Sequence, residues 1–167
     1  MGIGQPPGWP GEALGGFALV PPQDEVYAAF AEAGEDGDVI VHGLPNARVL
    51  TKVTAKRLYL LLDGEPPGKC LSGVFAEAVQ RGAIPYSMPA LVDLTRFTGQ
   101  VEWDHVEAVG RMAPWGTDGN SNVAYVVRNH AFHKLIKVAS VMFPATRHEI
   151  FLNRAEAIAW LDSLDKA

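Results

Sequence analysis

The chain has 167 residues, of which 48% are hydrophobic and 20% are charged, and its formal net charge is −5. This composition is typical of a soluble globular domain with a substantial core, and the negative charge argues against nucleic acid as a partner. A single cysteine, Cys70, excludes an intrachain disulfide and a cysteine zinc cluster. No apolar run has transmembrane length and the N-terminus lacks the basic region of a signal peptide, so we expect a cytoplasmic protein.

The first part of the chain predicts an irregular arm followed by short elements. Residues 1–22 contain six glycines and five prolines, which disfavour both helix and strand. Val26, Phe30 and Ala33 recur at helical spacing and predict a helix over residues 23–33, with Gly34 as its stop. Strands are predicted over residues 38–43, 49–53 and 58–63, the last two as a hairpin. We divide the chain into an arm with a short helix and strand, residues 1–45, and a domain of residues 46–167.

From residue 68 onward, helices and strands alternate. Helices are predicted over residues 68–81, 101–113 and 129–143, and strands over residues 90–94, 123–127 and 148–152. Asn153 and Glu156 form a capping box that opens a last helix. The alternation predicts an α/β fold, with a STAS-like sheet of about four to five core strands and helices packed against it. The sheet is expected to be mostly parallel, with an antiparallel N-terminal hairpin.

These elements resemble the SpoIIAA-like family, which has a STAS/CRAL-TRIO-like fold. The resemblance rests on Gly-Ala-Ile-Pro-Tyr (82–86), Leu-Val-Asp-Leu (91–94), Val-Ala-Tyr-Val-Val (123–127), Glu-Ile-Phe (149–151) and Glu-Ala-Ile-Ala-Trp-Leu (156–161). It covers roughly residues 47–165. The resemblance implies a small non-catalytic fold used in regulation or ligand binding, with an apolar cavity for lipid-like ligands.

The resemblance also implies a place to look for a phosphorylation switch. In STAS antagonists of anti-sigma factors, a kinase phosphorylates a serine in an Asp-Ser-Ser-Gly-like turn. The corresponding segment here, residues 93–99, has no adjacent Ser-Ser-Gly and offers only the hydroxyls of Thr95 and Thr98. This departure argues against a phospho-switch at either threonine.

Catalytic motifs are absent from the sequence. It contains no Gly-x-Ser-x-Gly elbow, no Walker loop and no His-Glu-x-x-His motif. His130 and His133 are three residues apart on a predicted helix, but solvated histidines explain that spacing better than a metal site. We therefore expect no enzymatic activity, no cofactor and no metal.

The predicted helix over residues 129–143 has an apolar face and a basic face. The basic surface consists of Arg128, His130, His133, Lys134 and Lys137. Such a surface can lie weakly and reversibly on an anionic membrane, although the solvated side of an ordinary core helix has the same pattern. The apolar residues that would line a ligand pocket are Trp103, Val106, Trp115, Phe132, Ile136, Met142 and Phe143.

Two functions follow as hypotheses. The first is a non-catalytic module that binds an apolar or lipid-like small molecule between helices 101–113 and 129–143. The second is a regulatory protein–protein interaction module or a homodimer. The second is motivated by charge, because up to residue 50 seven acidic residues face only Arg48, whereas residues 128–154 hold five lysines and arginines and only one acid.

Overall fold

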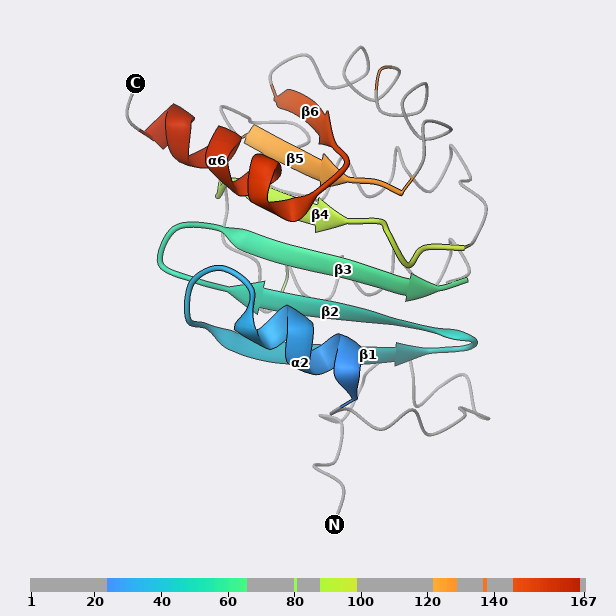
Figure 1. Cartoon of the computed structure of the whole chain (residues 1–167). Helices are drawn as coiled ribbons and strands as arrows, with labels where there is room; N and C mark the ends of the chain where they lie inside the picture. Colours follow the sequence, from blue (N-terminus) through green and yellow to red (C-terminus); the bar gives the residue numbers. More distant parts are fainter. Residues whose placement is uncertain are drawn as a thin grey trace.

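The computed structural model describes residues 24–65, 80, 88–98, 122–128, 137 and 146–165, and Figure 1 shows their arrangement. The predicted arm over residues 1–22 and the predicted helix 101–113 lie outside this range. Of the predicted helices 68–81 and 129–143, only Gln80 and Lys137 are described, and both are helical and exposed.

One six-stranded sheet forms the centre of the described structure. Its strands lie side by side in chain order: β1 (Asp38–Leu44), β2 (Ala47–Val53), β3 (Leu58–Gly64), β4 (Ala90–Asp93), β5 (Asn122–Val126) and β6 (Arg147–Phe151). The first three strands are antiparallel, and β3 to β6 are parallel. This confirms the predicted α/β class. Six strands take part because β1 pairs with β2 along its whole length.

A turn of two residues, Pro45 and Asn46, joins β1 to β2. Asn46 has a φ of 56°, a left-handed conformation that asparagine tolerates better than most residues. The predicted division of the chain at residues 45 and 46 falls in this turn, and it stays a prediction.

Residues of successive strands form continuous rows across the sheet. One row contains Asp38, Val53, Leu58, Ala90, Val123 and His148, and another contains Ile40, Thr51, Leu60, Val92, Tyr125 and Ile150. All four residues of β4 and the first five of β3 are buried, whereas no residue of β6 is. Burial at successive positions is typical of a strand that is covered on both faces, and β3 and β4 lie in the middle of the sheet.

Two helices are described over their full length, and their ends follow from local side-chain chemistry. Helix α2 (Glu25–Glu32) begins at Asp24, whose carboxylate accepts a hydrogen bond of 2.9 Å from the Tyr27 N–H. Gly34, with a φ of 72°, follows its end as predicted. Helix α6 (Arg154–Asp165) begins at the predicted cap, where the Asn153 side chain accepts a 2.8 Å hydrogen bond from the Glu156 N–H.

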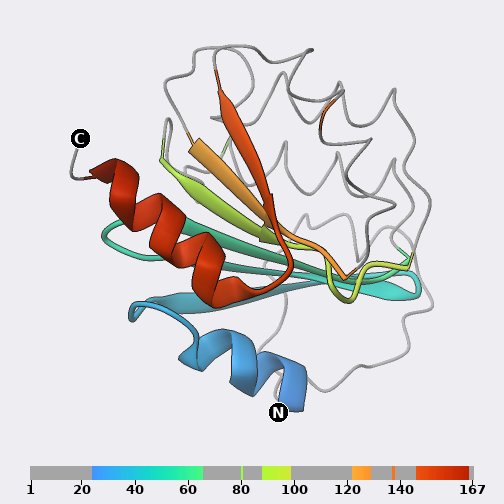
Figure 2. The same ribbon diagram turned by 45° about the horizontal axis from the view of Figure 1, so that its top comes forward.

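Both helices lie on the same face of the sheet, as Figure 2 shows. Helix α2 contacts β2, and α6 contacts β4, β5 and β6. The core on this helix face consists of Phe30, Leu50, Tyr59, Leu61, Leu91, Ala124, Val126, Ala157 and Leu161. A second apolar cluster lies on the opposite face and consists of Leu58, Leu60, Ala90, Val92 and Val123.

Candidate functional site

The carboxyl ends of β3 to β6 meet at one edge of the sheet, which we call the carboxyl edge. Leu61, Asp93, Val126 and Phe151 form the row that crosses these ends. Backbone hydrogen bonds continue beyond it, since the Leu94 N–H donates to the Val126 carbonyl at 2.8 Å. Open parallel sheets bind their ligands beyond the carboxyl ends of the strands. The loops that leave this edge are therefore the first place to seek a site.

Asp93, the last residue of β4, ties two of these loops together. Its Oδ1 accepts hydrogen bonds from the Thr95 N–H at 2.9 Å and the Thr95 hydroxyl at 2.6 Å. Its Oδ2 accepts a 2.7 Å hydrogen bond from Nη2 of Arg154, at the start of α6. The Asp93 side chain is only 6% exposed. Both of its oxygens thus serve to fix the exit of β4 against α6.

Asp63 makes a similar connection at the end of β3. Its two oxygens accept hydrogen bonds from Nε of Arg48 at 3.0 Å and Nε of Arg96 at 3.1 Å. The other end of Arg48 donates to the Asp24 carboxylate at 2.5 Å. Burial alone would raise the pKa of Asp24, but hydrogen bonds from the Tyr27 N–H and from Arg48 outweigh it and lower that pKa. The result is an alternating chain of charges that links the start of α2 to the exit of β4.

Other side chains at the carboxyl edge reach solvent. The Arg96 side chain is 51% exposed although it is paired with Asp63. Thr98 and Arg128 are exposed, and Leu152, directly after β6, is 54% exposed. We define the carboxyl-edge surface as Thr95, Arg96, Thr98, Arg128 and Leu152. It combines two arginines with one of the two large hydrophobic residues that are exposed in the described part of the chain.

The structure describes only some of the predicted site residues, and these differ in exposure. Thr95 is partly buried and bonded to Asp93, whereas Thr98 is exposed and its N–H donates to the Gly64 carbonyl at 3.0 Å. Arg128 and Lys137, from the predicted basic surface, are both exposed. The remaining predicted residues lie outside the described range: His130, His133, Lys134, Trp103, Val106, Trp115, Phe132, Ile136, Met142 and Phe143.

The roles of Asp63, Asp93 and Arg154 are not anticipated by the sequence analysis. One signal for them is present, because β3 and β4 both place an aspartate at or next to their carboxyl end. Arg154 lies 61 residues after Asp93, so that pairing has no local signature.

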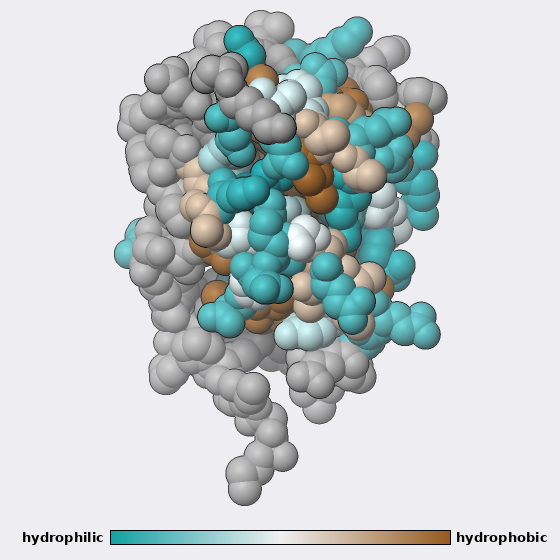
Figure 3. Space-filling model, turned by 60° about the vertical axis from the view of Figure 1, so that its left-hand side comes forward, coloured by the Kyte–Doolittle hydropathy of each residue, from teal (hydrophilic) through white to brown (hydrophobic). Residues whose placement is uncertain are grey.

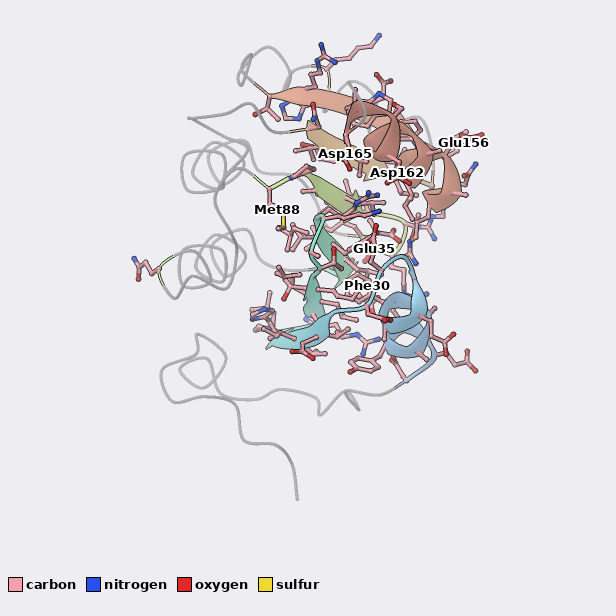
Figure 4. All side chains as sticks on the ribbon, turned by 90° about the vertical axis from the view of Figure 1, so that its left-hand side faces the viewer. Phe30, Glu35, Met88, Glu156, Asp162 and Asp165 are labelled. Atoms are coloured by element: carbon pink, nitrogen blue, oxygen red, sulfur yellow. The ribbon has the colours of Figure 1, made fainter. Side chains whose placement is uncertain are left out.

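The opposite, amino edge of the sheet holds a second set of charges around Arg57, which precedes β3. The Arg57 side chain is 1% exposed, and its Nη2 lies 3.4 Å from Oε1 of Glu35 and 3.8 Å from Oδ2 of Asp165. The same nitrogen donates to Asp162. Figure 4 looks onto this edge, with Asp162 and Asp165 on α6 and Glu35 in the loop after α2. One buried guanidinium thereby fastens both helices to the turn between β2 and β3.

Lys52 is the second buried cation at this edge. Its Nζ donates to the carbonyl oxygens of Phe30 at 3.4 Å and Ala31 at 3.2 Å, and also to that of Ala33. These carbonyls lie at the end of α2, where a positive charge also complements the helix dipole, and that of Phe30 accepts the Ala33 N–H as well. Burial lowers the pKa of Lys52, and the negative charge of Glu35 opposes this effect.

Tyr59 completes this amino-edge network. Its hydroxyl donates a hydrogen bond to Glu35, and its ring lies 5.0 Å from Nζ of Lys52. Burial, together with the bond to Glu35, raises the pKa of the Tyr59 hydroxyl. For Arg57, burial alone would lower the pKa, but Asp162 and Glu35 outweigh it and raise that pKa. On this side of the molecule the described surface is mainly hydrophilic, with small separate apolar areas (Figure 3).

A polar pair also borders the apolar cluster of the opposite face. The Tyr125 hydroxyl lies 2.9 Å from Nδ1 of His148, and the two rings are stacked. Burial raises the pKa of the Tyr125 hydroxyl. Tyr125 packs against the cluster of Leu58, Leu60 and Val92, so one edge of that cluster carries hydrogen-bonding groups.

Among the described residues, no group of three or more His, Cys, Asp or Glu side chains is placed to hold a metal ion. Within the same ranges, no helix is long and apolar enough to cross a membrane.

Comparisons with known proteins give one structural match. No family model and no curated protein matches the sequence. A solved structure similar to this chain is an uncharacterized protein of the DUF3478 family with a SpoIIAA-like fold from Shewanella loihica PV-4. The two sequences are 15% identical with a TM-score of 0.46, and the match covers 77% of this chain and 98% of that chain. The fold named there is the one that the sequence resemblance implies, and a likeness of this size makes no statement on activity or partners.

Proposed function

We propose that this protein is a non-catalytic interaction module that binds an acidic segment of a partner protein at its carboxyl-edge surface. The observation that carries the proposal is that the carboxylates of this edge are paired whereas two of its arginines are exposed. The carboxylates of Asp63 and Asp93 are held by arginines, whereas Arg96 and Arg128 extend into solvent beside the exits of β4 and β5. Within the described residues, this edge exposes the positive charges of Arg96 and Arg128 and, directly after β3, the negative charge of Glu65.

The chemistry of the surface suits a peptide that carries carboxylates around one apolar side chain. Guanidinium groups bind carboxylates through paired, directional hydrogen bonds. Leu152 adds an exposed apolar group next to these charges, and a small apolar centre with a charged rim is the usual anatomy of a protein interface. Charge complementarity of this kind mainly raises the association rate and the selectivity.

The aspartates of the carboxyl edge support a binding role over a catalytic one. A general acid or base needs a carboxyl group that can reach a substrate proton. Asp93 is almost fully buried, with both oxygens engaged by Thr95 and Arg154. The Thr95 hydroxyl donates a hydrogen bond to Asp93. We therefore propose that binding at this edge works without phosphorylation of Thr95.

The test uses the full chain and a short, fluorescently labelled peptide rich in glutamate with one central leucine. We expect binding at low salt, measured by fluorescence anisotropy, and a loss of affinity of at least about fivefold in Arg128→Glu because one of the two positive charges of the surface becomes negative. Lys56→Glu is the matched control, since Lys56 is also exposed and lies in the turn at the opposite edge. Absence of binding by the parent chain, or equal losses in the two variants, contradicts the proposal.

A second candidate function is the binding of an apolar or lipid-like molecule between helices 101–113 and 129–143, with weak membrane contact. The observation that favours it is the Tyr125–His148 pair at the border of the opposite-face cluster. Apolar sites commonly use a few such polar groups to orient a ligand. Native mass spectrometry of freshly purified protein tests this candidate, and a mass that equals the bare chain in every preparation counts against it.

A further inference from the structure

The strand under α2 carries charged residues on the face that the helix covers. Along β2, the residues on this face are Arg48, Leu50 and Lys52, and Arg57 lies on the same face just before β3. All four are buried, and we call them the basic strip. Apolar residues usually stabilise a permanently covered surface at least as well as buried ion pairs do. Cations, unlike apolar side chains, are well hydrated when they are uncovered, so the basic strip suits a surface that is covered only part of the time.

Helix α2 and the loop after it cover the basic strip with groups of complementary charge. The Asp24 carboxylate, at the start of α2, pairs with Nη2 of Arg48 at 2.5 Å. Backbone carbonyls at the end of α2 accept hydrogen bonds from Nζ of Lys52. Glu35, in the following loop, lies 3.4 Å from Nη2 of Arg57. Each cation of the strip thus has a partner on α2 or in the loop that follows.

The apolar part of this contact is small. Helix α2 has eight residues, and its buried side chain is Phe30, which belongs to the same core cluster as Leu50 and Tyr59. Helix α6 has twelve residues, buries Ala157 and Leu161, and contacts β4, β5 and β6. Because short helices depend on the packing of an apolar face, α2 is expected to open more readily than α6.

The loop between α2 and β1 allows the helix to leave while the sheet stays paired. A side chain at Gly34 would collide with the Tyr59 ring, and one at Gly37 would collide with the Val53 carbonyl. Glycine thus lets the loop lie directly on the sheet, and it also has the backbone freedom of a hinge. The next residue, Asp38, already pairs with Val53 of β2. Opening of α2 would therefore uncover the basic strip and keep the β1–β2 ladder.

We propose that α2 is an internal ligand of the basic strip and that an acidic amphipathic helix of a partner protein replaces it there. The partner chemistry follows from residues 24–36, which contain five acidic residues and no lysine or arginine. The acidic groups of the partner pair with Arg48 and Arg57, and one aromatic side chain takes the place of Phe30, as in other helix-in-groove complexes. This proposal goes beyond the proposed function, because the basic strip and the carboxyl-edge surface share no residue.

The test uses the full chain and an end-blocked, fluorescently labelled peptide with the sequence of residues 24–36. The double variant Ala28→Gly with Ala29→Gly favours opening, because both alanines are exposed on α2 and glycine disfavours the helix without changing the basic strip. A ligand that needs the open state binds in proportion to its population. We therefore expect the double variant to bind the peptide about twentyfold more tightly than the parent in fluorescence anisotropy.

Changes in the peptide alone show whether it binds as α2 does. Phe30→Ala in the peptide removes the apolar anchor and should weaken binding at least tenfold. Glu35→Gln removes a partner of Arg57 and should weaken binding about threefold. Glu32→Gln is the matched control, since it removes the same charge from an exposed position of α2. Equal affinities for the four peptides overturn the proposal.

Other results of the peptide assay also overturn it. One is a double variant that is folded by circular dichroism but does not bind the peptide more tightly than the parent. Another is a loss of more than about threefold when Arg128→Glu is added, because the peptide would then lie at the carboxyl-edge surface. If the double variant does not fold, Ala29→Gly alone serves the same test, with an expected gain of about fivefold.

Two measurements without peptide complete the test. In amide hydrogen exchange of the parent, α2 should exchange faster than α6, β2 and β3, and exchange of α2 only by global unfolding overturns the proposal. Sedimentation velocity of the double variant should show a monomer. A dimer would assign the basic strip to α2 of a second copy and overturn the assignment to a partner protein.

Discussion

At the amino edge of the sheet the cations are buried, whereas at the carboxyl edge two arginines reach solvent. Arg57 and Lys52 are almost inaccessible, and α2, the loop after it and α6 cover them with carboxylates and backbone carbonyls. Arg96 and Arg128 lie just after the ends of β4 and β5, and both side chains are exposed. The same residue type thus holds the fold together at one end and offers a charged surface at the other.

The difference between the two edges comes from what covers them. A buried ion pair contributes little over an apolar pair of the same shape, but removal of one partner leaves an uncompensated charge and is costly. An exposed arginine contributes little to stability and is free to bind. Substitutions at the amino edge should therefore change stability, and substitutions at the carboxyl edge should change binding.

The largest expected effect follows from Arg57→Met. Removing the buried guanidinium leaves Glu35, Asp162 and Asp165 facing one another without their counter-ion. Because these carboxylates are themselves partly exposed, we expect a loss of about 3 kcal/mol in the free energy of unfolding. Urea unfolding followed by circular dichroism measures it.

The matched control for Arg57→Met is Asp165→Asn, which removes only the longest and most exposed of the three ion pairs. Its expected cost is below about 0.5 kcal/mol. Equal losses in the two variants would show that Arg57 is not the centre of the network.

A second effect concerns His42, a buried side chain on the opposite face whose ring Nε2 lies 3.3 Å from Oγ1 of Thr51. Burial lowers the pKa of His42 to about 4, so the unfolded chain takes up the proton first as the pH falls. Stability is fully present above the ordinary histidine pKa of about 6.5 and decreases by about 2–3 kcal/mol as the pH falls to about 4.

Unfolding of the parent and of His42→Gln across this pH range checks the sign. The difference between their pH dependences isolates His42 from the other titrating groups. Parallel curves for the two proteins would mean that His42 does not titrate as its burial implies.

A smaller effect is expected for Lys52→Met, which removes the hydrogen bonds to the end of α2 but keeps an apolar stem of similar length. The carbonyls of Ala31 and Ala33 lose a hydrogen-bond donor. Both residues are partly exposed, so water can replace part of the lost hydrogen bonding. We expect a loss of about 1–2 kcal/mol and faster amide hydrogen exchange that is confined to α2. Unchanged exchange in α2 would contradict the assigned role of Lys52.

The smallest effect on stability belongs to the carboxyl edge. Arg128→Glu, the binding variant, should unfold within about 0.5 kcal/mol of the parent because Arg128 is exposed. A large destabilisation there would remove the contrast between the two edges.

The sequence predicts the strands well because the pattern that indicates their burial lies in neighbouring residues. The successive apolar residues of β3 and β4, and the capping pair Asn153 and Glu156, depend only on near neighbours. Lys52 and Arg57 look like ordinary residues of a solvated hairpin. Their burial depends on packing against α2 and α6, which are distant in the sequence, so no local pattern predicts it.

The candidate site is predicted less completely for the same reason. The predicted basic surface includes Arg128, which the structure shows to be exposed. The pairing of Asp63 with Arg96 spans 33 residues and that of Asp93 with Arg154 spans 61. The order of the strands in the sheet brings these partners together, and the hydrophobic periodicity of the sequence does not predict that order.

The bond between Arg57 and Asp162 also has a consequence for how the chain is made. These residues are 105 positions apart, so when the hairpin of β2 and β3 leaves the ribosome, Glu35 is the only one of the three acidic partners of Arg57 that already exists. Until α6 is complete, Arg57 has only part of its counter-charge, and the part of the guanidinium that α6 later covers stays hydrated. The helix face is therefore expected to settle late, after the last helix has been added.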